Sequence, residues 1–244
     1  MFENSELKQR AKAVFKRFGY KLPILVSFVG GILASGFSTL FSFVSENEED
    51  LNALYENPEL APILPIITLI VTAISIIWGI FVKYPVVVGV NRFFMEHRAF
   101  GSRFNRIFWA FKSGKYLNVV KTLFVVDLKI FLWGLLLIIP GIIKSYQYCM
   151  VPYILAENPG IETKRALELS KKMTAGEKFN IFLLHLSFIG WIFLCLFTCG
   201  IGYIFLDPYM NGTYAELYQV MREKAHNLEI SDFSELPGFL PEEE

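Results

Sequence analysis

Residues 104–153 read FNRIFWAFKSGKYLNVVKTLFVVDLKIFLWGLLLIIPGIIKSYQYCMVPY, and this stretch decides the fold class. Its first apolar residues follow the i, i+3, i+4, i+7 spacing of one face of an amphipathic helix: Phe104, Ile107, Phe108 and Phe111. A mostly apolar run, a turn signal at Pro140-Gly141 and a second, shorter apolar run follow. The stretch therefore predicts an interfacial helix followed by a membrane hairpin.

The composition of the whole chain agrees with a membrane protein. Of its 244 residues, 54% are hydrophobic and 16% aromatic, and the mean hydropathy is +0.43, which is too apolar for an ordinary soluble domain. Three uncharged runs, residues 22–45, 60–82 and 179–206, reach the roughly 20 residues needed to cross about 30 Å of hydrocarbon. The third run has room for a turn and a return helix. With the two runs around Pro140-Gly141, we predict an all-α polytopic membrane protein with six transmembrane helices and cytoplasmic interfacial amphipathic helices.

Charge predicts the orientation of these spans. Basic residues gather before the first span, between the second and third, after the fourth and after the sixth, whereas the loop 46–59 carries acidic residues and no basic one. By the positive-inside rule, both termini are expected in the cytoplasm and the acidic loop outside. The first 21 residues are charged and amphipathic, unlike a signal peptide, so we expect the N-terminus to stay attached and to lie along the membrane.

Landmarks recur along the chain and predict an internal repeat. The second unit shows Gly114, Trp133-Gly134, Pro140-Gly141 and Pro152-Tyr153; the third shows Gly176, Gly190-Trp191, Cys199-Gly200 and Pro208-Tyr209. We predict three helix-plus-hairpin units, about 5–98, 104–158 and 161–222, within one membrane domain, 1–224. The alternative is that any six-span protein with basic loops resembles a repeat.

The last residues, 225–244, are acidic and contain two prolines, so we expect a flexible C-terminal tail. A second interpretation gives the tail's apolar residues a role in binding a partner: Phe233, Leu236, Phe239 and Leu240.

Ionisable residues inside the predicted spans are candidates for a functional site, since each costs several kcal/mol unless paired, hydrated or able to reach the interface. They are Asp127, Lys129, Lys144, His185 and Asp207. The units align so that Asp127 and His185 fall at similar depths, and we expect Asp127 to pair with His185, and Asp207 with Lys129 or Lys144. Such pairs could line a polar cavity or fix the helix register, and the structural interpretation is the stronger.

Enzyme signatures are absent: the sequence has no H-E-x-x-H, G-x-S-x-G, P-loop or G-x-G-x-x-G motif. We therefore predict no enzymatic activity, no catalytic residues and no cofactor. The spacing of Cys195 and Cys199, with His185 upstream, could suggest metal ligands, but cysteine is a common small apolar residue in buried helices. We predict no metal site.

A basic rim is expected to contact anionic lipid, because each such charge near an anionic leaflet contributes about 1 kcal/mol. Its members are Arg106, Lys112, Lys115, Arg165, Lys171, Lys172 and Lys178. The expected partners are membrane lipids, especially anionic ones, and a second copy of the chain or a membrane partner protein. Nucleic acid is not expected, because its binding requires more charge and less apolar surface.

Three segments of the second and third units resemble a known family. They are IIPGIIKSYQYCMVPYILAENP (138–159), RALELSKKMTAGEKF (165–179) and LSFIGWIFLCLFTCGIGYIFLDPYMNGTYAELY (186–218), and YPVVVGVNRFFM (84–95) in the first unit is similar to an earlier signature of the same family. The family is one of uncharacterised bacterial integral membrane proteins. The resemblance implies a six-span protein of the bacterial cytoplasmic membrane and supplies no catalytic residues.

Together these patterns favour a non-enzymatic membrane protein that binds or translocates a small molecule, an ion or a lipid through a polar interior between the units. The alternative is a structural or regulatory membrane protein whose cytoplasmic helices dock a partner or shape the bilayer. An enzyme acting on lipids is the third possibility, since Asp, His and Lys could supply acid–base chemistry.

Overall fold

The structure, a computed structural model, describes residues 2–46 and 62–239, with side chains described for 2–35 and 62–239. These residues contain helices and no strand, which confirms the all-α class for the described part. The predicted acidic loop, residues 46–59, lies outside the described residues except for Glu46. The elements are α1 (Asn4–Phe18), α2 (Lys21–Glu46), α4 (Leu64–Trp78), the π-helical turn η1 (Gly79–Lys83), α5 (Tyr84–Phe100), the 3-10 turn η2 (Phe104–Phe108), α6 (Trp109–Lys112), α7 (Tyr116–Leu136), α8 (Ile138–Tyr148), α9 (Val151–Glu157), α10 (Thr163–Met173), α11 (Lys178–Phe197) and α12 (Ile201–Asn227).

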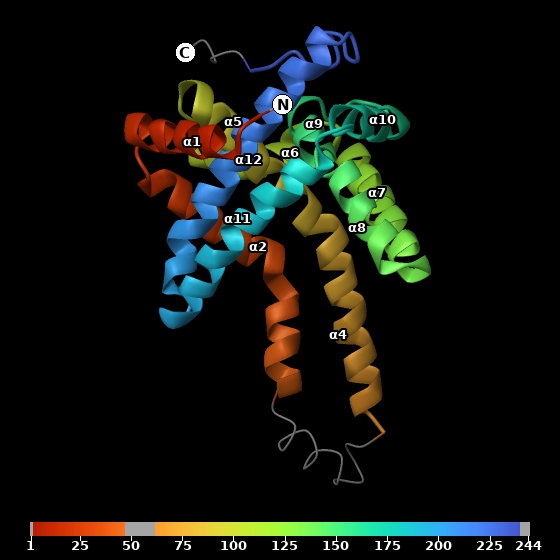
Figure 1. Ribbon diagram of the computed structural model, residues 1–244. Coiled ribbons are helices and arrows are strands. Elements are labelled where there is room, and N and C mark those ends of the chain that lie inside the picture. Colours follow the sequence, from red (N-terminus) through yellow and green to blue (C-terminus); the bar gives the residue numbers. More distant parts are fainter. Residues whose placement is uncertain (1, 47–61, 240–244) are drawn as a thin grey trace.

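Helix α1 and the C-terminal end of α12 lie at one end of the molecule, which we call the terminal end (Figure 1). The helices α1, α9 and α10 surround it. From there α2 and α4 extend furthest away, towards what we call the distal end, whereas the α7–α8 and α11–α12 hairpins stop well short of it. The three hairpins are therefore of unequal depth.

The predicted N-terminal amphipathic helix is α1, whose buried face carries Leu7, Ala11 and Phe15. It ends at Gly19, whose φ of 89° is a conformation that favours glycine. The chain then bends by 111° into α2. The corresponding helix predicted over residues 104–111 is instead a 3-10 turn, η2, followed by the four-residue α6.

Two helices of the described residues are long and apolar enough to cross a membrane: the continuous helix Leu64–Phe100 and α11. The bent pair α1–α2 would make a third. The structure thus supports a membrane-associated chain, while six spans are not confirmed. Two of the predicted spans differ from a membrane-crossing helix. Helix α7 carries three charged residues, Lys121, Asp127 and Lys129. The 11 residues of α8 rise only about 16 Å, roughly half of the hydrocarbon thickness.

Three helical segments contain a proline, and in each of them the helix continues after the proline. Pro85 stands at the start of α5, directly after η1, so the helix passes through it rather than ending there. Having no N–H, Pro85 donates nothing to the carbonyl of Phe81, four residues earlier, and the hydroxyl of Tyr116 donates to that carbonyl at 2.7 Å. A hydroxyl from another segment thus supports the backbone before the proline.

Hydroxyl-to-carbonyl bonds also lie close to the other two prolines, although the carbonyls are three and five residues before the proline instead of four. Before Pro208 in α12, the hydroxyl of Tyr20 donates to the carbonyl of Phe205. Before Pro152 in α9, the hydroxyl of Ser170 donates to the carbonyl of Gln147 at 2.9 Å. Each hydroxyl lies far from its proline in sequence, so these bonds join separate parts of the fold.

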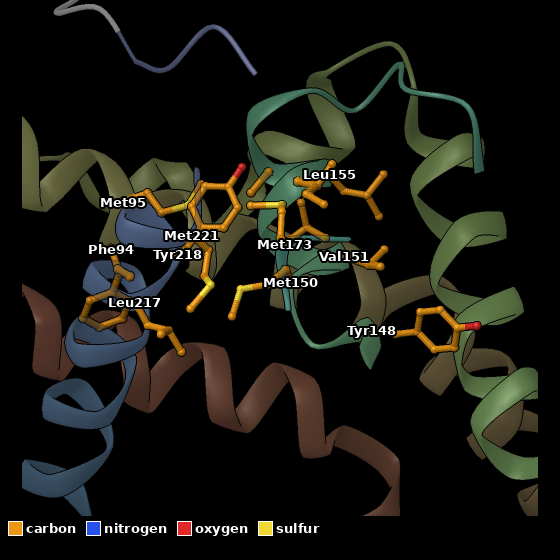
Figure 2. Close-up of a cluster of buried hydrophobic side chains, with 14 of the residues drawn as sticks. Phe94, Met95, Tyr148, Met150, Val151, Leu155, Met173, Leu217, Tyr218 and Met221 are labelled. Carbon is orange, nitrogen blue, oxygen red and sulfur yellow. The ribbon is translucent and has the colours of Figure 1, made fainter. Parts of the chain in front are cut away.

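The core lies at the terminal end, where α5, α9, α10 and α12 meet. Figure 2 shows its side chains, including the sulfur atoms of Met95, Met150, Met173 and Met221. These are four of the chain's six methionines, and each is at most 3% exposed. Unbranched, polarisable side chains of this kind fill irregular gaps between helices.

Residues 228–239, which belong to the tail predicted for residues 225–244, pack against this core. Leu236 is fully buried, the ring of His226 stacks on Phe233 at 4.4 Å, and the backbone N–H of Gly238 donates to Glu157. Arg165 binds Glu235 at 2.6 Å. The segment thus contacts the rest of the fold through the ion pair of Arg165 with Glu235 and the buried side chain of Leu236.

Candidate functional site

A large cavity opens between α1, α11 and α12, and we call it the α1–α12 groove. Its volume is about 580 Å³. Apolar walls come from the α11–α12 hairpin: Trp191, Leu194, Phe205 and Leu206. The sequence produces these walls because both arms of the hairpin are apolar all round, so residues that face the cavity and residues that face outwards are alike hydrophobic. A cavity of this size and lining suits an apolar or amphipathic ligand.

Lysines of α1 stand beside this groove. Lys12 lines it, with its Nζ 5.7 Å from the centre of the Tyr209 ring. One turn earlier, Lys8 places its Nζ 4.3 Å from the centre of the Phe188 ring. Neither lysine has a carboxylate partner among the residues that the structure describes. The groove is thus apolar along its walls and cationic at its α1 side.

A second cavity, of about 350 Å³, lies between α2 and α12 and contains Asp207. The Asp207 carboxylate accepts a hydrogen bond from Asn211 at 3.0 Å, and the hydroxyls of Ser27 and Tyr203 contact the same group. These neutral donors replace the predicted pairing of Asp207 with Lys129 or Lys144. The sequence identified Asp207 as a candidate but not its partner Ser27, which lies in a different predicted unit.

The other predicted acid, Asp127, also has a neutral partner. It accepts a hydrogen bond from the hydroxyl of Tyr84 at 2.7 Å. His185, its expected partner, instead lies with its Nδ1 2.9 Å from the carbonyl oxygen of Ile181. The His185 ring is 5.0 Å from that of Tyr214. The predicted pair of Asp127 and His185 is therefore replaced by two separate polar contacts.

The two predicted lysines lie on the α7–α8 hairpin. Lys129 is exposed on α7, and the Nζ of Lys144 on α8 is 5.1 Å from the centre of the Trp133 ring. Thus the five predicted residues do not converge on one polar interior. The structure distributes them between the Asp207 cavity, the Tyr84 and Tyr214 contacts, and the outer face of the hairpin.

The predicted basic rim divides into paired and exposed members. Arg106 binds Glu96 at 2.7 Å, Lys172 binds Glu168 at 2.6 Å, and Arg165 binds Glu235. The hydrogen bond from Arg165 lowers the pKa of the Glu235 carboxyl, since it favours the charged form. The remaining members are exposed or half-exposed: Lys112, Lys115, Lys171 and Lys178.

Sequence patterns missed three buried glutamates on helices that meet at the core. Glu96 is 2% exposed, Glu157 7% and Glu216 3%. Each is paired with an arginine: Arg92 and Arg106 with Glu96, both at 2.7 Å, Arg222 with Glu157 at 3.4 Å, and Arg98 with Glu216 at 2.9 Å. A signal did exist, because these acids stand among apolar residues in α5, α9 and α12. Their burial fits a structural role.

The residues that the structure describes contain no group of three or more His, Cys, Asp or Glu side chains able to hold a metal ion. The thiols of Cys149, Cys195 and Cys199 are free. Cys195 lines the α1–α12 groove, and Cys199 is exposed, so the two cysteines have different surroundings.

Comparison with known proteins identifies a family and no individual relative. Neither the search of curated proteins nor the search of solved structures returned a match. One family model, described as "Protein of unknown function (DUF975)", matches residues 1–225. This match covers nearly the whole chain, including all the residues that line the α1–α12 groove. The chain therefore belongs to the DUF975 family of proteins of unknown function.

Proposed function

We propose that the chain is a non-enzymatic, multi-pass protein of the bacterial cytoplasmic membrane that binds an anionic lipid in the α1–α12 groove. The observation that carries this proposal is an apolar cavity of about 580 Å³ with Lys12 in its lining. An acyl chain would contact the walls formed by Trp191 and Phe205. The phosphate of the headgroup would lie at the α1 side, beside Lys12 and Lys8.

The orientation in this proposal has both termini in the cytoplasm. It is supported by the position of α1 and of the C-terminal end of α12 at the terminal end (Figure 1) and by the basic residues of α1 and α10, such as Lys16 and Lys171. All six hydrophobic segments enter the membrane in this arrangement, and α8 reaches only part of the way. Membrane lipids are then the first partners, and a second copy of the chain or a membrane protein could bind to the exposed helices.

The proposal includes three helix-plus-hairpin units, and two sets of contacts support it. The hydroxyl of Tyr20 in the first unit reaches the third unit at Phe205, Tyr116 in the second reaches the first, and Ser170 in the third reaches the second. This is a cyclic order, as three similar units arranged around an axis would give.

The second set of contacts lies four residues after each proline, where each unit has a small buried residue: Gly89, Ala156 and Gly212. In the first and third units, the first segment of the next unit packs against this small residue, and the unit next to the third is the first. A Cβ on Gly89 would meet Ile107, and a Cβ on Gly212 would meet Phe15. The same cyclic order appears again, in helix packing rather than in hydrogen bonds.

Tryptophan quenching tests the lipid site directly. The full chain in nanodiscs would be titrated with phosphatidylglycerol or phosphatidylcholine that carries brominated acyl chains, and the Trp191 signal obtained by subtracting a Trp191→Phe variant. We expect stronger quenching by phosphatidylglycerol, and loss of that preference in Lys12→Gln. Lys164→Gln, an exposed lysine outside both the groove and the predicted basic rim, is the matched control. Equal quenching by the two lipids, or an unchanged preference in Lys12→Gln, would overturn the proposal.

The Asp207 cavity favours a second candidate function, passage of a small cation or proton. Its support is a carboxylate in a cavity of about 350 Å³ surrounded by hydroxyl and amide groups. Asp207→Cys, in a background without the three native cysteines, would be treated with a charged thiol reagent from each side of a vesicle. Labelling from both sides in separate samples supports passage, whereas full protection removes this candidate.

A further inference from the structure

The α7–α8 hairpin carries an apolar tip with a lysine on each arm. Residues 130–143 contain no charged side chain, and Lys129 and Lys144 flank them directly. The tip is open to its surroundings, since Leu135 is 75% exposed and Ile138 76%. From residue 130 to residue 136 the first arm rises about 10 Å at 1.5 Å per residue. Such a tip can enter one leaflet and cannot cross a bilayer.

The packing of α8 brings further lysines to the same place. It contacts α7, α10 and α11, and Lys144 therefore lies within electrostatic range of Lys129 on α7, Lys171 on α10 and Lys178 at the start of α11. We call these four residues the lysine cluster. None of them forms an ion pair with a carboxylate among the described residues.

Aromatic rings hold part of this cluster in place. The Nζ of Lys144 lies 5.1 Å from the centre of the Trp133 ring and 6.0 Å from that of Tyr148. Tryptophan and tyrosine favour the boundary between hydrocarbon and headgroups, where one side of the ring is apolar and the other polar. The rings and the ends of the apolar tip therefore indicate the same depth, that of the lipid phosphates.

We propose that the lysine cluster binds the phosphate group of an anionic membrane lipid while the α7–α8 tip lies among the acyl chains of the same leaflet. Three of these charges act on Lys144, none of the four forms an ion pair with a carboxylate of the described residues, and a phosphate would relieve the repulsion on Lys144. The adjoining tip distinguishes a lipid phosphate from a free one, because only a lipid would also supply hydrocarbon. This site shares no residue with the α1–α12 groove and stands independently of the function proposed for it.

The test uses the full chain in nanodiscs of phosphatidylcholine with increasing phosphatidylglycerol that has brominated acyl chains. The readout is quenching of Trp133, obtained by subtracting a Trp133→Phe variant. Each lysine near an anionic surface contributes an amount equivalent to about fivefold in affinity, so we expect half-quenching of Lys144→Gln to need about five times more phosphatidylglycerol. The double variant Lys129→Gln/Lys144→Gln should need about 25 times more.

The controls separate this site from general attraction to charge. Lys121→Gln/Lys164→Gln removes two exposed lysines that belong neither to the cluster nor to the predicted basic rim, and it should leave the Trp133 titration within twofold of the unchanged chain. An equal shift in this control, or no shift in the cluster variants, would overturn the proposal. Competition by millimolar inorganic phosphate that abolishes the preference would assign the site to free anions and refute the lipid. Thermal stability should not fall in Lys129→Gln, because this change removes repulsion within the cluster, whereas Lys144→Gln also loses its contacts with the rings of Trp133 and Tyr148.

Discussion

The two halves of the helix Leu64–Phe100 have opposite surroundings although they form one continuous rod. The α4 half has no buried residue, and Leu69 in it is 70% exposed. The α5 half buries ten residues, including Phe93, which is fully buried. The change occurs at η1 and Pro85, where the helix passes from the distal to the terminal part of the molecule (Figure 1).

Soluble proteins bury apolar residues and expose charged ones, and the two halves of this helix show the opposite distribution. The exposed α4 half is wholly apolar apart from hydroxyls such as Thr68, which donates to the backbone of its own helix. The buried α5 half contains Arg92, Glu96 and His97. An exposed apolar helix is stable where the surroundings are lipid, and a buried charged helix is stable where its charges are paired. The comparison therefore makes α4 suited to a hydrocarbon environment and places the protein interior along α5.

The largest effect is expected from removing a buried charge on the α5 side. Glu96 accepts from Arg92 and Arg106, both at 2.7 Å. Glu96→Ala therefore removes the carboxylate that these two largely buried guanidinium groups share, although Arg92 keeps its hydrogen bond to the carbonyl of Ala156. We expect the free energy of unfolding to fall by about 3–5 kcal/mol. Leu69→Ala on the α4 side is the control and should change it by less than about 1 kcal/mol. Thermal unfolding in detergent measures both, and equal losses would refute the distinction between the halves.

A smaller effect is expected from adding one methyl group to each half. In Gly89→Ala the new Cβ would lie 1.9 Å from the carbonyl oxygen of Ile107, and a backbone atom cannot move aside cheaply. We expect destabilisation by about 1–3 kcal/mol. Gly79→Ala in η1 meets nothing within 4 Å and should be neutral or slightly stabilising. If Gly89→Ala unfolds at no lower temperature than Gly79→Ala, α5 does not pack tightly on η2.

The smallest effect concerns the junction itself. Tyr116→Phe removes the hydroxyl that donates to Phe81, and the expected loss is about 0.5–1.5 kcal/mol. In Pro85→Ala the new N–H can donate to the same carbonyl, so Tyr116→Phe should then cost less. A double-mutant cycle on thermal stability measures this coupling. Additive effects would show that the hydroxyl does not compensate for the proline.

The local sequence pattern predicted much of the helical structure but not how far each hairpin extends towards the distal end. The apolar face of α1 and the turns near Gly19 and Gly200 were readable because each depends on neighbours within a few residues. The six-span count was not confirmed, because apolarity does not distinguish a helix that crosses a membrane from a short hairpin. Only the packed structure shows that α8 has 11 residues before the chain turns into α9.

Partners between distant segments were beyond the reach of one sequence. Asp207 was a readable candidate because a charge stands in an apolar run, but its neighbour Ser27 is 180 residues away. The same limit applies to the α1–α12 groove, whose lining joins Lys12 to Trp191. The buried glutamates were readable as charges among apolar residues, whereas their arginine partners follow from how α5, α9 and α12 meet.

The segment that follows α12 has a practical consequence for anyone who prepares this protein. The family match ends at residue 225, two residues before α12 itself ends, and a gene trimmed to that limit would encode a chain without Leu236 and Gly238. Leu236 would no longer fill its place in the core, and Glu157 would lose the N–H of Gly238. The family match and the packed structure thus end at different residues, and the expressed chain should extend at least to Phe239.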